Sequence, residues 1–311
     1  MYLKGIEEYT KVIEKHNPFD FPDGIFRVTA GNAGECLMVI GSEKTAIIDC
    51  GMAYCGKKLV ENIKETLKAN GREKLDYVML THSHYDHMGA LPYVLKAWPN
   101  AKVCASAKTK KVFTSAGARE TMRVLSEAAN TLYKGDDPEP ISMEGIRVDI
   151  VLDEGDSVSI GDEKFVTIVT KGHTDCSISF ALEPRRILFL SESTGVMMDE
   201  GMRVEAIIVK SGKDAYESVD KCIAYDANVL ITPHYGVHPH GYEWRFFEMF
   251  KADQAEREEF VLKLHKEGKS FEEILDLYDD RFKTELDIQP HEAFIENAKS
   301  IIKVIIHEHA E

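Results

Sequence analysis

Six consecutive residues in the first third of the chain hold four side chains that could bind a metal. His82, His84, Asp86 and His87 lie in the run Leu-Thr-His-Ser-His-Tyr-Asp-His-Met-Gly, residues 80–89. Imidazole nitrogens and carboxylate oxygens are ordinary ligands of zinc, iron and manganese. A chance set of surface histidines would rarely be so compact, so the run predicts a metal site.

The flanking residues predict how these side chains are positioned. The apolar stretch 75–80 predicts a strand, and Gly89-Ala90-Leu91-Pro92 predicts the start of a helix. Ligands on a turn between the two can converge on one point, whereas neighbouring residues of a strand face opposite ways.

The spacing His-x-His-x-Asp-His resembles the signature of the metallo-β-lactamase superfamily, and the resemblance covers about residues 20 to 240. It implies an α+β protein built as a four-layer αββα sandwich. It also implies three later ligands, each after a strand-like apolar run: His173, Glu192 and His234.

The resemblance also implies how the ligands divide between two metal ions. His82, His84 and His173 would bind the first ion. The second ion would be bound by Asp86, His87 and His234, with Glu192 bridging the two. Zinc is the expected metal, with iron or manganese as alternatives.

Glu192 departs from the family pattern, which usually has an aspartate at this position. The longer side chain could bridge both ions, bind only one, or shift the preference towards manganese or iron. The second ion depends most on this residue.

Two cations about 3.5–4 Å apart share a hydroxide and lower its pKa towards neutrality. Such a hydroxide attacks a carbonyl carbon or a phosphorus without a side-chain nucleophile, and the chain has no GxSxG elbow to supply one. We assign catalytic roles to Asp86 and Tyr235. The hydroxyl of Tyr235, or that of Tyr85, could bind a developing oxyanion, although packing is the more ordinary role.

Three further residues near the predicted ligands have alternative interpretations. Asp49 follows a predicted strand, and it either orients a ligand, as the resemblance implies, or simply forms a turn. His238 and His240 closely follow His234. One of them could replace His234 as a ligand or contact the substrate, but we expect both to be histidines of a surface loop.

Composition excludes several classes of protein. The 311 residues carry a formal net charge of −15, which argues against a nucleic-acid partner. No apolar run approaches the roughly 20 residues of a membrane span, and the first residues show no signal pattern. The six scattered cysteines form no CxxC pair and favour a reduced, cytoplasmic protein. The partner expected for the chain is a small-molecule substrate.

The chain divides, by its pattern, into a metallo-β-lactamase-like domain over residues 1–245 and a helical C-terminal extension over 246–311. Charged amphipathic helices are expected at 256–267, 271–278 and 291–309. The extension could cap a substrate cleft, pack as an appendage, or form a homodimer.

The first functional hypothesis is a dinuclear metal-dependent hydrolase of a small thioester or ester, similar to glyoxalase II or acyl-CoA thioesterases. The alternatives are a lactonase, a phosphodiesterase, or a non-catalytic metal-binding regulator. A β-lactamase is disfavoured because no export signal is seen. Flavo-diiron proteins usually place a glutamate where His84 stands. Since one scaffold of this kind supports many reactions, the sequence does not select the substrate.

Overall fold

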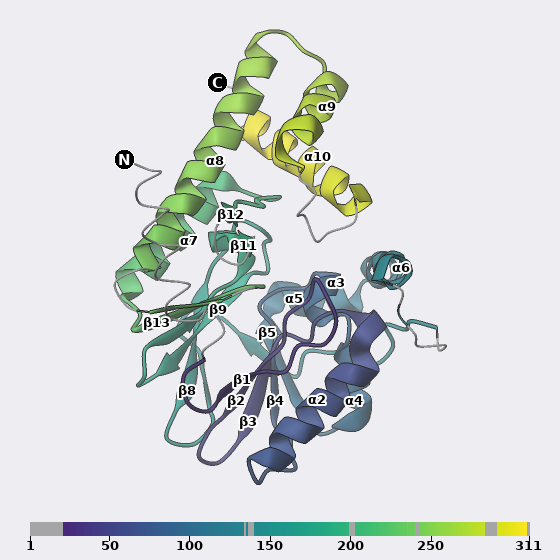
Figure 1. The fold of residues 1–311 in the computed structure, drawn as a ribbon, viewed down its shortest axis with the longest axis vertical. Coiled ribbons are helices and arrows are strands. Elements are labelled where there is room, and N and C mark those ends of the chain that lie inside the picture. The colour runs from purple at the N-terminus through teal and green to yellow at the C-terminus, as the bar shows by residue number, and fades with distance from the viewer. Residues whose placement is uncertain are drawn as a thin grey trace. The chain divides into compact units, whose positions relative to one another are not determined.

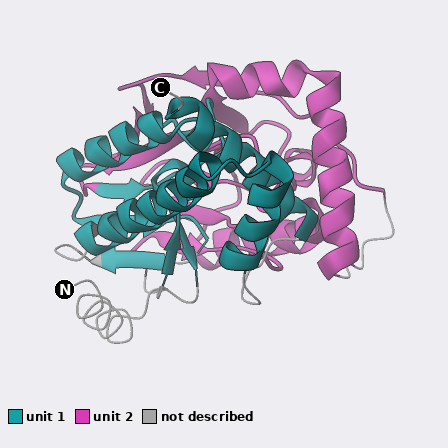
Figure 2. Ribbon diagram, turned by 90° about the horizontal axis from the view of Figure 1, so that it is seen from above, with its two compact units in different colours: residues 1–20, 170–177, 187–311 teal, residues 21–169, 178–186 magenta. Residues whose placement is uncertain are grey.

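The computed structural model describes residues 21–133, 135, 140–198, 203–234, 236–239, 243–283 and 291–309. Their strands form two six-stranded sheets, in the orders β1-β2-β3-β4-β5-β6 and β14-β13-β10-β9-β8-β7, and one two-stranded sheet (Figure 1). Contacts divide the chain into two compact units (Figure 2). Unit 2 holds residues 21–169 and 178–186, and unit 1 holds 170–177 and the described residues from 187 onward. The predicted boundary at residue 245 stays a prediction.

The first sheet of unit 2 is mixed. Strands β1, β2 and β3 pair antiparallel, and strands β3 to β6 pair parallel. Parallel neighbours need long crossovers, which the helices between the strands provide. The strands are β1 (Ile25–Arg27), β2 (Leu37–Ile40), β3 (Thr45–Ile48), β4 (Tyr77–Met79), β5 (Lys102–Ser106) and β6 (Ile150–Leu152).

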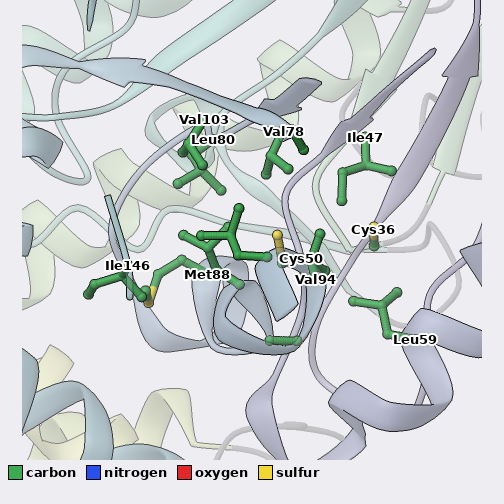
Figure 3. Packing of buried hydrophobic residues seen from close by; sticks show 14 of the residues in the cluster. Cys36, Ile47, Cys50, Leu59, Val78, Leu80, Met88, Val94, Val103 and Ile146 are labelled. Atoms are coloured by element: carbon green, nitrogen blue, oxygen red, sulfur yellow. The ribbon is translucent and has the colours of Figure 1, made fainter. Parts of the chain in front are cut away.

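Helices α2 (Gly56–Ala69) and α4 (Leu91–Ala97) supply one side of the core of this sheet. Leu59, Ile63 and Leu67 of α2 recur at helical spacing and are all buried. They pack in one cluster with strand residues (Figure 3), where Leu59 and Val94 come from helices, and Ile47 and Val78 come from strands. Burial of each such side chain stabilises the unit by about 1.5–3 kcal/mol.

The remaining elements of unit 2 follow the first sheet or lie between its strands. A 3-10 turn, η1 (Ala53–Cys55), precedes α2, and the short helix α3 (Tyr85–Met88) precedes α4. Helices α5 (Ala107–Thr114) and α6 (Ala116–Tyr133) follow β5. An antiparallel meander then contains β7 (Ser157–Ser159), β8 (Lys164–Val169) and β9 (Ile178–Glu183).

Unit 1 contains β10 (Ile187–Phe189), which pairs parallel with β13 (Val229–Thr232), and β13 pairs antiparallel with β14 (Gly236–Pro239). The 3-10 turn η2 (Glu192–Thr194) follows β10, and β11 (Val196–Met198) pairs with β12 (Arg203–Glu205). Helix α7 (Gly212–Tyr225) is capped at its N-terminus by Ser211, whose hydroxyl accepts a hydrogen bond from the Asp214 N–H.

Three C-terminal helices pack on one another within unit 1: α8 (Glu243–Lys266), α9 (Phe271–Phe282) and α10 (His291–Glu308) (Figure 1). The first was expected to begin near residue 256 but begins at Glu243. Buried Phe246, Phe247 and Phe250 extend it towards the N-terminus, because packing of an apolar face stabilises helix beyond its charged part. Within the described ranges, no helix combines the length and apolarity that crossing a membrane requires.

Candidate metal centre

The first set of predicted ligands lies where β4 passes through a turn into α3, as the sequence predicts. His82 and His87 are buried, while His84 and Asp86 are partly exposed. The ring of His82 lies 4.7 Å from that of His84 and 4.1 Å from that of His87, measured between centroids. The turn therefore brings three imidazoles together.

Asp49 orients this set from the end of β3. Its carboxylate accepts hydrogen bonds from the Thr81 N–H (2.8 Å), the Thr81 hydroxyl (2.7 Å) and Nδ1 of His87 (2.8 Å). Because the Thr81 hydroxyl donates to Asp49, it can accept from Nδ1 of His82, 3.1 Å away. Both rings thus use Nδ1 for a protein oxygen, which leaves Nε2 as the nitrogen for a metal. These contacts favour the orienting role of Asp49 over a simple turn.

The second set consists of His173, Glu192 and His234, all buried in unit 1. His173 lies in the loop after β8, Glu192 begins η2, and His234 follows β13 with a positive φ of 71°. One carboxylate oxygen of Glu192 lies 2.9 Å from Nε2 of His173, and the other lies 2.6 Å from Nε2 of His234. Glu192 therefore faces a different histidine with each oxygen.

The loop that carries His173 is fixed by its backbone and by its ring. The backbone N–H of His173 donates to the Ser193 hydroxyl at 3.0 Å, and the Thr170 and Ser191 hydroxyls lie 2.8 Å apart. Nδ1 of His173 hydrogen-bonds to the carbonyl oxygen of Ile207. Since a carbonyl can only accept, the proton of this imidazole lies on Nδ1.

This tautomer tests whether the residues fit a metal. With its proton on Nδ1, the neutral ring of His173 presents a lone pair on Nε2 to the Glu192 carboxylate, 2.9 Å away. Two acceptors attract each other at that distance only if a proton or a metal cation lies between them. Nε2 of His87, 3.4 Å from a carboxylate oxygen of Asp86, is in the same situation. The donor set therefore fits a divalent cation.

Two groups of side chains can each offer ligand atoms that all lie within 4.8 Å of one another. The first group is His82, His84, His173 and Glu192, and the second is Asp86, His87, Glu192 and His234. Glu192 belongs to both. The two clusters are consistent with a dinuclear metal site and follow the division that the resemblance implies, while the role of each residue as a ligand stays a prediction.

The structure describes some of the other predicted site residues and not others. Tyr85 is the first residue of α3 and is partly buried. Tyr235 and His240 lie outside the described residues, so the catalytic role of Tyr235 stays a prediction, as does that of Asp86.

The expectation for His238 was wrong. The residue is completely buried on β14, with Nε2 3.5 Å from the Thr232 hydroxyl, and burial lowers the pKa of its imidazole to about 3. Residues 236–239 form a strand and not a loop, because they pair antiparallel with β13.

Sequence reasoning also missed Thr81 and Ile207, which hydrogen-bond to the predicted ligands His82 and His173. A hydroxyl directly before the first histidine was a visible signal for Thr81. Ile207 acts through its backbone carbonyl, for which no side-chain pattern exists.

Comparison with known proteins identifies the family. The model of the metallo-beta-lactamase superfamily matches residues 30–234, a span that contains all seven predicted ligands. The chain belongs to the metallo-β-lactamase superfamily. Its ligand set and family are those of a metal-dependent hydrolase.

Two curated proteins are distantly similar to the chain. The acyl-coenzyme A thioesterase of Homo sapiens is 25% identical over 181 residues, which cover 54% of this chain and 62% of that protein. The hydroxyacylglutathione hydrolase of Francisella tularensis subsp. novicida is 23% identical over 165 residues, covering 53% and 51%. The chain thus spans only about half to three fifths of these relatives.

Solved structures confirm the predicted fold class, two mixed sheets flanked by helices, with further helices at the C-terminus. A metallo-beta-lactamase family protein from Thermus thermophilus has a TM-score of 0.62 at 18% identity, covering 93% of this chain and 95% of that one. A superfamily protein from Sulfolobus tokodaii has a TM-score of 0.56 at 19% identity, covering 92% and 100%. At such identities the likeness extends to the fold alone.

Proposed function

We propose that this chain is a dinuclear metal-dependent hydrolase of a small thioester or ester. The observation that carries the proposal is the placement of Glu192, whose two carboxylate oxygens face one histidine from each ligand group. The two curated relatives, an acyl-coenzyme A thioesterase and a hydroxyacylglutathione hydrolase, support a thioester substrate.

When bound, two divalent ions supply an activated water at neutral pH and neutralise the oxygen on which negative charge develops. The protein's own part is to hold the ligands rigidly in the correct tautomers. Asp49 and Thr81 do so for His87 and His82, and the Ile207 carbonyl does so for His173. Because these rings are buried, charge interactions around them are stronger than they would be in water.

Asp86 and Tyr235 have proposed catalytic roles beyond binding. The partly exposed carboxylate of Asp86 can accept a proton from the attacking water. Tyr235, next to His234 in the sequence, can donate a hydrogen bond to the developing oxyanion. Zinc suits this set of nitrogen and oxygen ligands. A small-molecule partner and a cytoplasmic location stay predictions.

The test begins with protein purified without added metal. Elemental analysis should find two metal equivalents per chain. In a panel of acyl-CoA and glutathione thioesters, lactones and phosphodiesters, a thioester should be hydrolysed fastest. His84→Ala and Asp86→Ala should each lower kcat/KM by more than about 100-fold, since changes to groups around a metal already cost 10–100-fold.

Each contrary result would overturn a different part of the proposal. Full activity in either variant would remove that residue from the site. Two bound metals with fast hydrolysis of only lactones or phosphodiesters would change the substrate class. A stable protein that binds no metal and hydrolyses nothing would be a binding module.

Glu192 has its own test, because its length departs from the family pattern. Glu192→Asp should keep both metal equivalents and most activity if the carboxylate bridges. Glu192→Ala should reduce the metal content to one equivalent or fewer, measured by elemental analysis. Unchanged content and activity in Glu192→Ala would show that this carboxylate is not a ligand.

A further inference from the structure

Helix α8 is hydrogen-bonded to the segment that orients His173. The carboxylate of Asp253, on α8, accepts a hydrogen bond of 2.8 Å from the Ala206 N–H. The next residue is Ile207, whose carbonyl oxygen accepts the Nδ1–H of His173. All of these groups belong to unit 1.

The orienting segment is anchored on both sides of that carbonyl. Before Ile207, Asp253 anchors the segment through the Ala206 N–H. Beyond Ile207, the Lys210 and Ser211 N–H groups both donate to the Gly172 carbonyl at 3.1 Å. Ala206 is completely buried, so in the folded chain its N–H depends on the Asp253 carboxylate as its acceptor. The direction of the Ile207 carbonyl therefore depends on the Asp253 contact.

Asp253 is itself held by a buried cation. Arg257, one helical turn later and 2% exposed, donates through Nε to Asp253 at 2.6 Å. The same guanidinium hydrogen-bonds to the Tyr278 hydroxyl on α9, lies 3.9 Å from Glu205, and lies 4.6 Å from the ring centroid of Phe282. Since a buried charge is costly to leave unpaired, this arrangement keeps the Asp253 carboxylate in one position.

We infer that Asp253 is a positioning residue for the metal ligand His173 and acts through Ala206 and Ile207. The C-terminal helices therefore contribute to the metal centre and not only to packing. The inference rests on the proposed function, because it takes His173 to be a ligand. Groups that hydrogen-bond to a ligand histidine fix its tautomer and ring plane, and their loss weakens metal binding about 10–100-fold.

The experiment compares three full-length chains that all carry Arg257→Leu, so that no unpaired arginine confuses the result. Glu205 keeps its contact with Arg203 in all of them. Residue 253 is left as aspartate in the first, changed by Asp253→Asn in the second, and changed by Asp253→Ala in the third. Asparagine still offers an oxygen to the Ala206 N–H, whereas alanine does not.

Zinc affinity is measured by competition with a chromophoric chelator, and cobalt(II) loading gives a visible spectrum that reports coordination geometry. The first two chains should bind both zinc ions equally well. The chain with Asp253→Ala should bind one of its two ions about 10–100-fold more weakly, with a changed cobalt spectrum for that ion. Lys251→Ala, which removes a surface ion pair between α8 and Asp220 of α7, should change neither the zinc affinity nor the cobalt spectrum.

Two outcomes overturn the inference alone: equal zinc affinity in all three chains, or an equal loss with Asp253→Asn and Asp253→Ala. A native chain that binds no zinc overturns the proposed function, and with it the ligand role of His173. Folding is checked by circular dichroism. If Arg257→Leu prevents folding, Arg257→Gln replaces it in all three chains, because glutamine is uncharged and its amide can still hydrogen-bond to the Tyr278 hydroxyl.

Discussion

Thr81 links two histidines that belong to different ligand groups. Its hydroxyl donates to Asp49, which also holds His87, and it is placed to accept from His82. Its backbone N–H makes a separate bond to Asp49 that no side-chain substitution removes. The side chain of Thr81 therefore affects His82 more than it affects His87.

Thr81→Val should weaken the binding of one metal ion about tenfold or more, because His82 loses the acceptor that fixes its tautomer. Valine keeps the β-branched shape, so packing is conserved. Thr81→Ser keeps the hydroxyl and should bind both ions normally. Zinc competition titrations of the three chains check this, and equal affinity with valine and serine would contradict it.

His238 should make stability depend on pH. The ordinary pKa of histidine is about 6.5, and burial lowers it to about 3 in the folded chain. Between these values the unfolded chain binds a proton that the folded chain does not, so stability falls as the pH drops through this window. Between pH 7 and pH 5 the loss is about 2 kcal/mol for this group.

His238→Gln should therefore flatten the pH dependence of unfolding. Urea midpoints of the native chain and the variant are compared at pH 7 and pH 5. All other ionisable groups are the same in both proteins, so their effects cancel in the difference. Parallel pH dependence in the two proteins would show that the buried His238 imidazole contributes nothing.

At the scale of elements, the loop carrying His173 rests on helix α7. Gly172 has a φ of +135°, and a Cβ added there would lie 2.6 Å from Cα and Cβ of Ala215. The Ser218 hydroxyl also donates to the Lys171 carbonyl at 2.7 Å. Only glycine allows this close approach, so the residue before the histidine is set by the helix and not by metal chemistry.

Gly172→Ala should destabilise the chain by about 2–5 kcal/mol, because it combines backbone strain with overpacking. Gly155→Ala is the matched control. Gly155 also has a positive φ, of 81°, but nothing lies within 4 Å of the added Cβ, so strain alone should cost about 1–2 kcal/mol. Denaturant unfolding measures both, and equal losses would mean that the contact with Ala215 does not matter.

The sequence names all seven candidate ligands because four of them lie in one short motif and the others follow apolar strands. The groups that orient the ligands are distant in sequence. Thr81 and Asp49 are 32 residues apart, His173 and Ile207 are 34 apart, and Ala206 and Asp253 are 47 apart. Such contacts arise only when the strands pair and the helices pack, which local pattern cannot predict. The burial of His238 and the early start of α8 were missed for the same reason.

At the scale of the whole molecule, metal binding should be part of stability. Ions that bind only the folded chain stabilise it according to their affinity, by about 2.7 kcal/mol for each ion at 100 times its Kd. A strong chelator should therefore lower the melting temperature. In Glu192→Ala the chelator should lower the melting temperature by less than in the native chain. An unchanged melting temperature in the native chain would contradict metal binding by the folded state.

The hydrogen bonds that join His82 to His87 through Thr81 and Asp49 have a consequence for loading. An ion that fixes the orientation of one of these imidazole rings also fixes that of the other. The second ion therefore binds to a site that is already ordered. We expect cooperative uptake. Samples prepared with too little zinc should then be mixtures of empty and doubly loaded molecules, with few singly loaded ones, and native mass spectrometry would resolve the three masses.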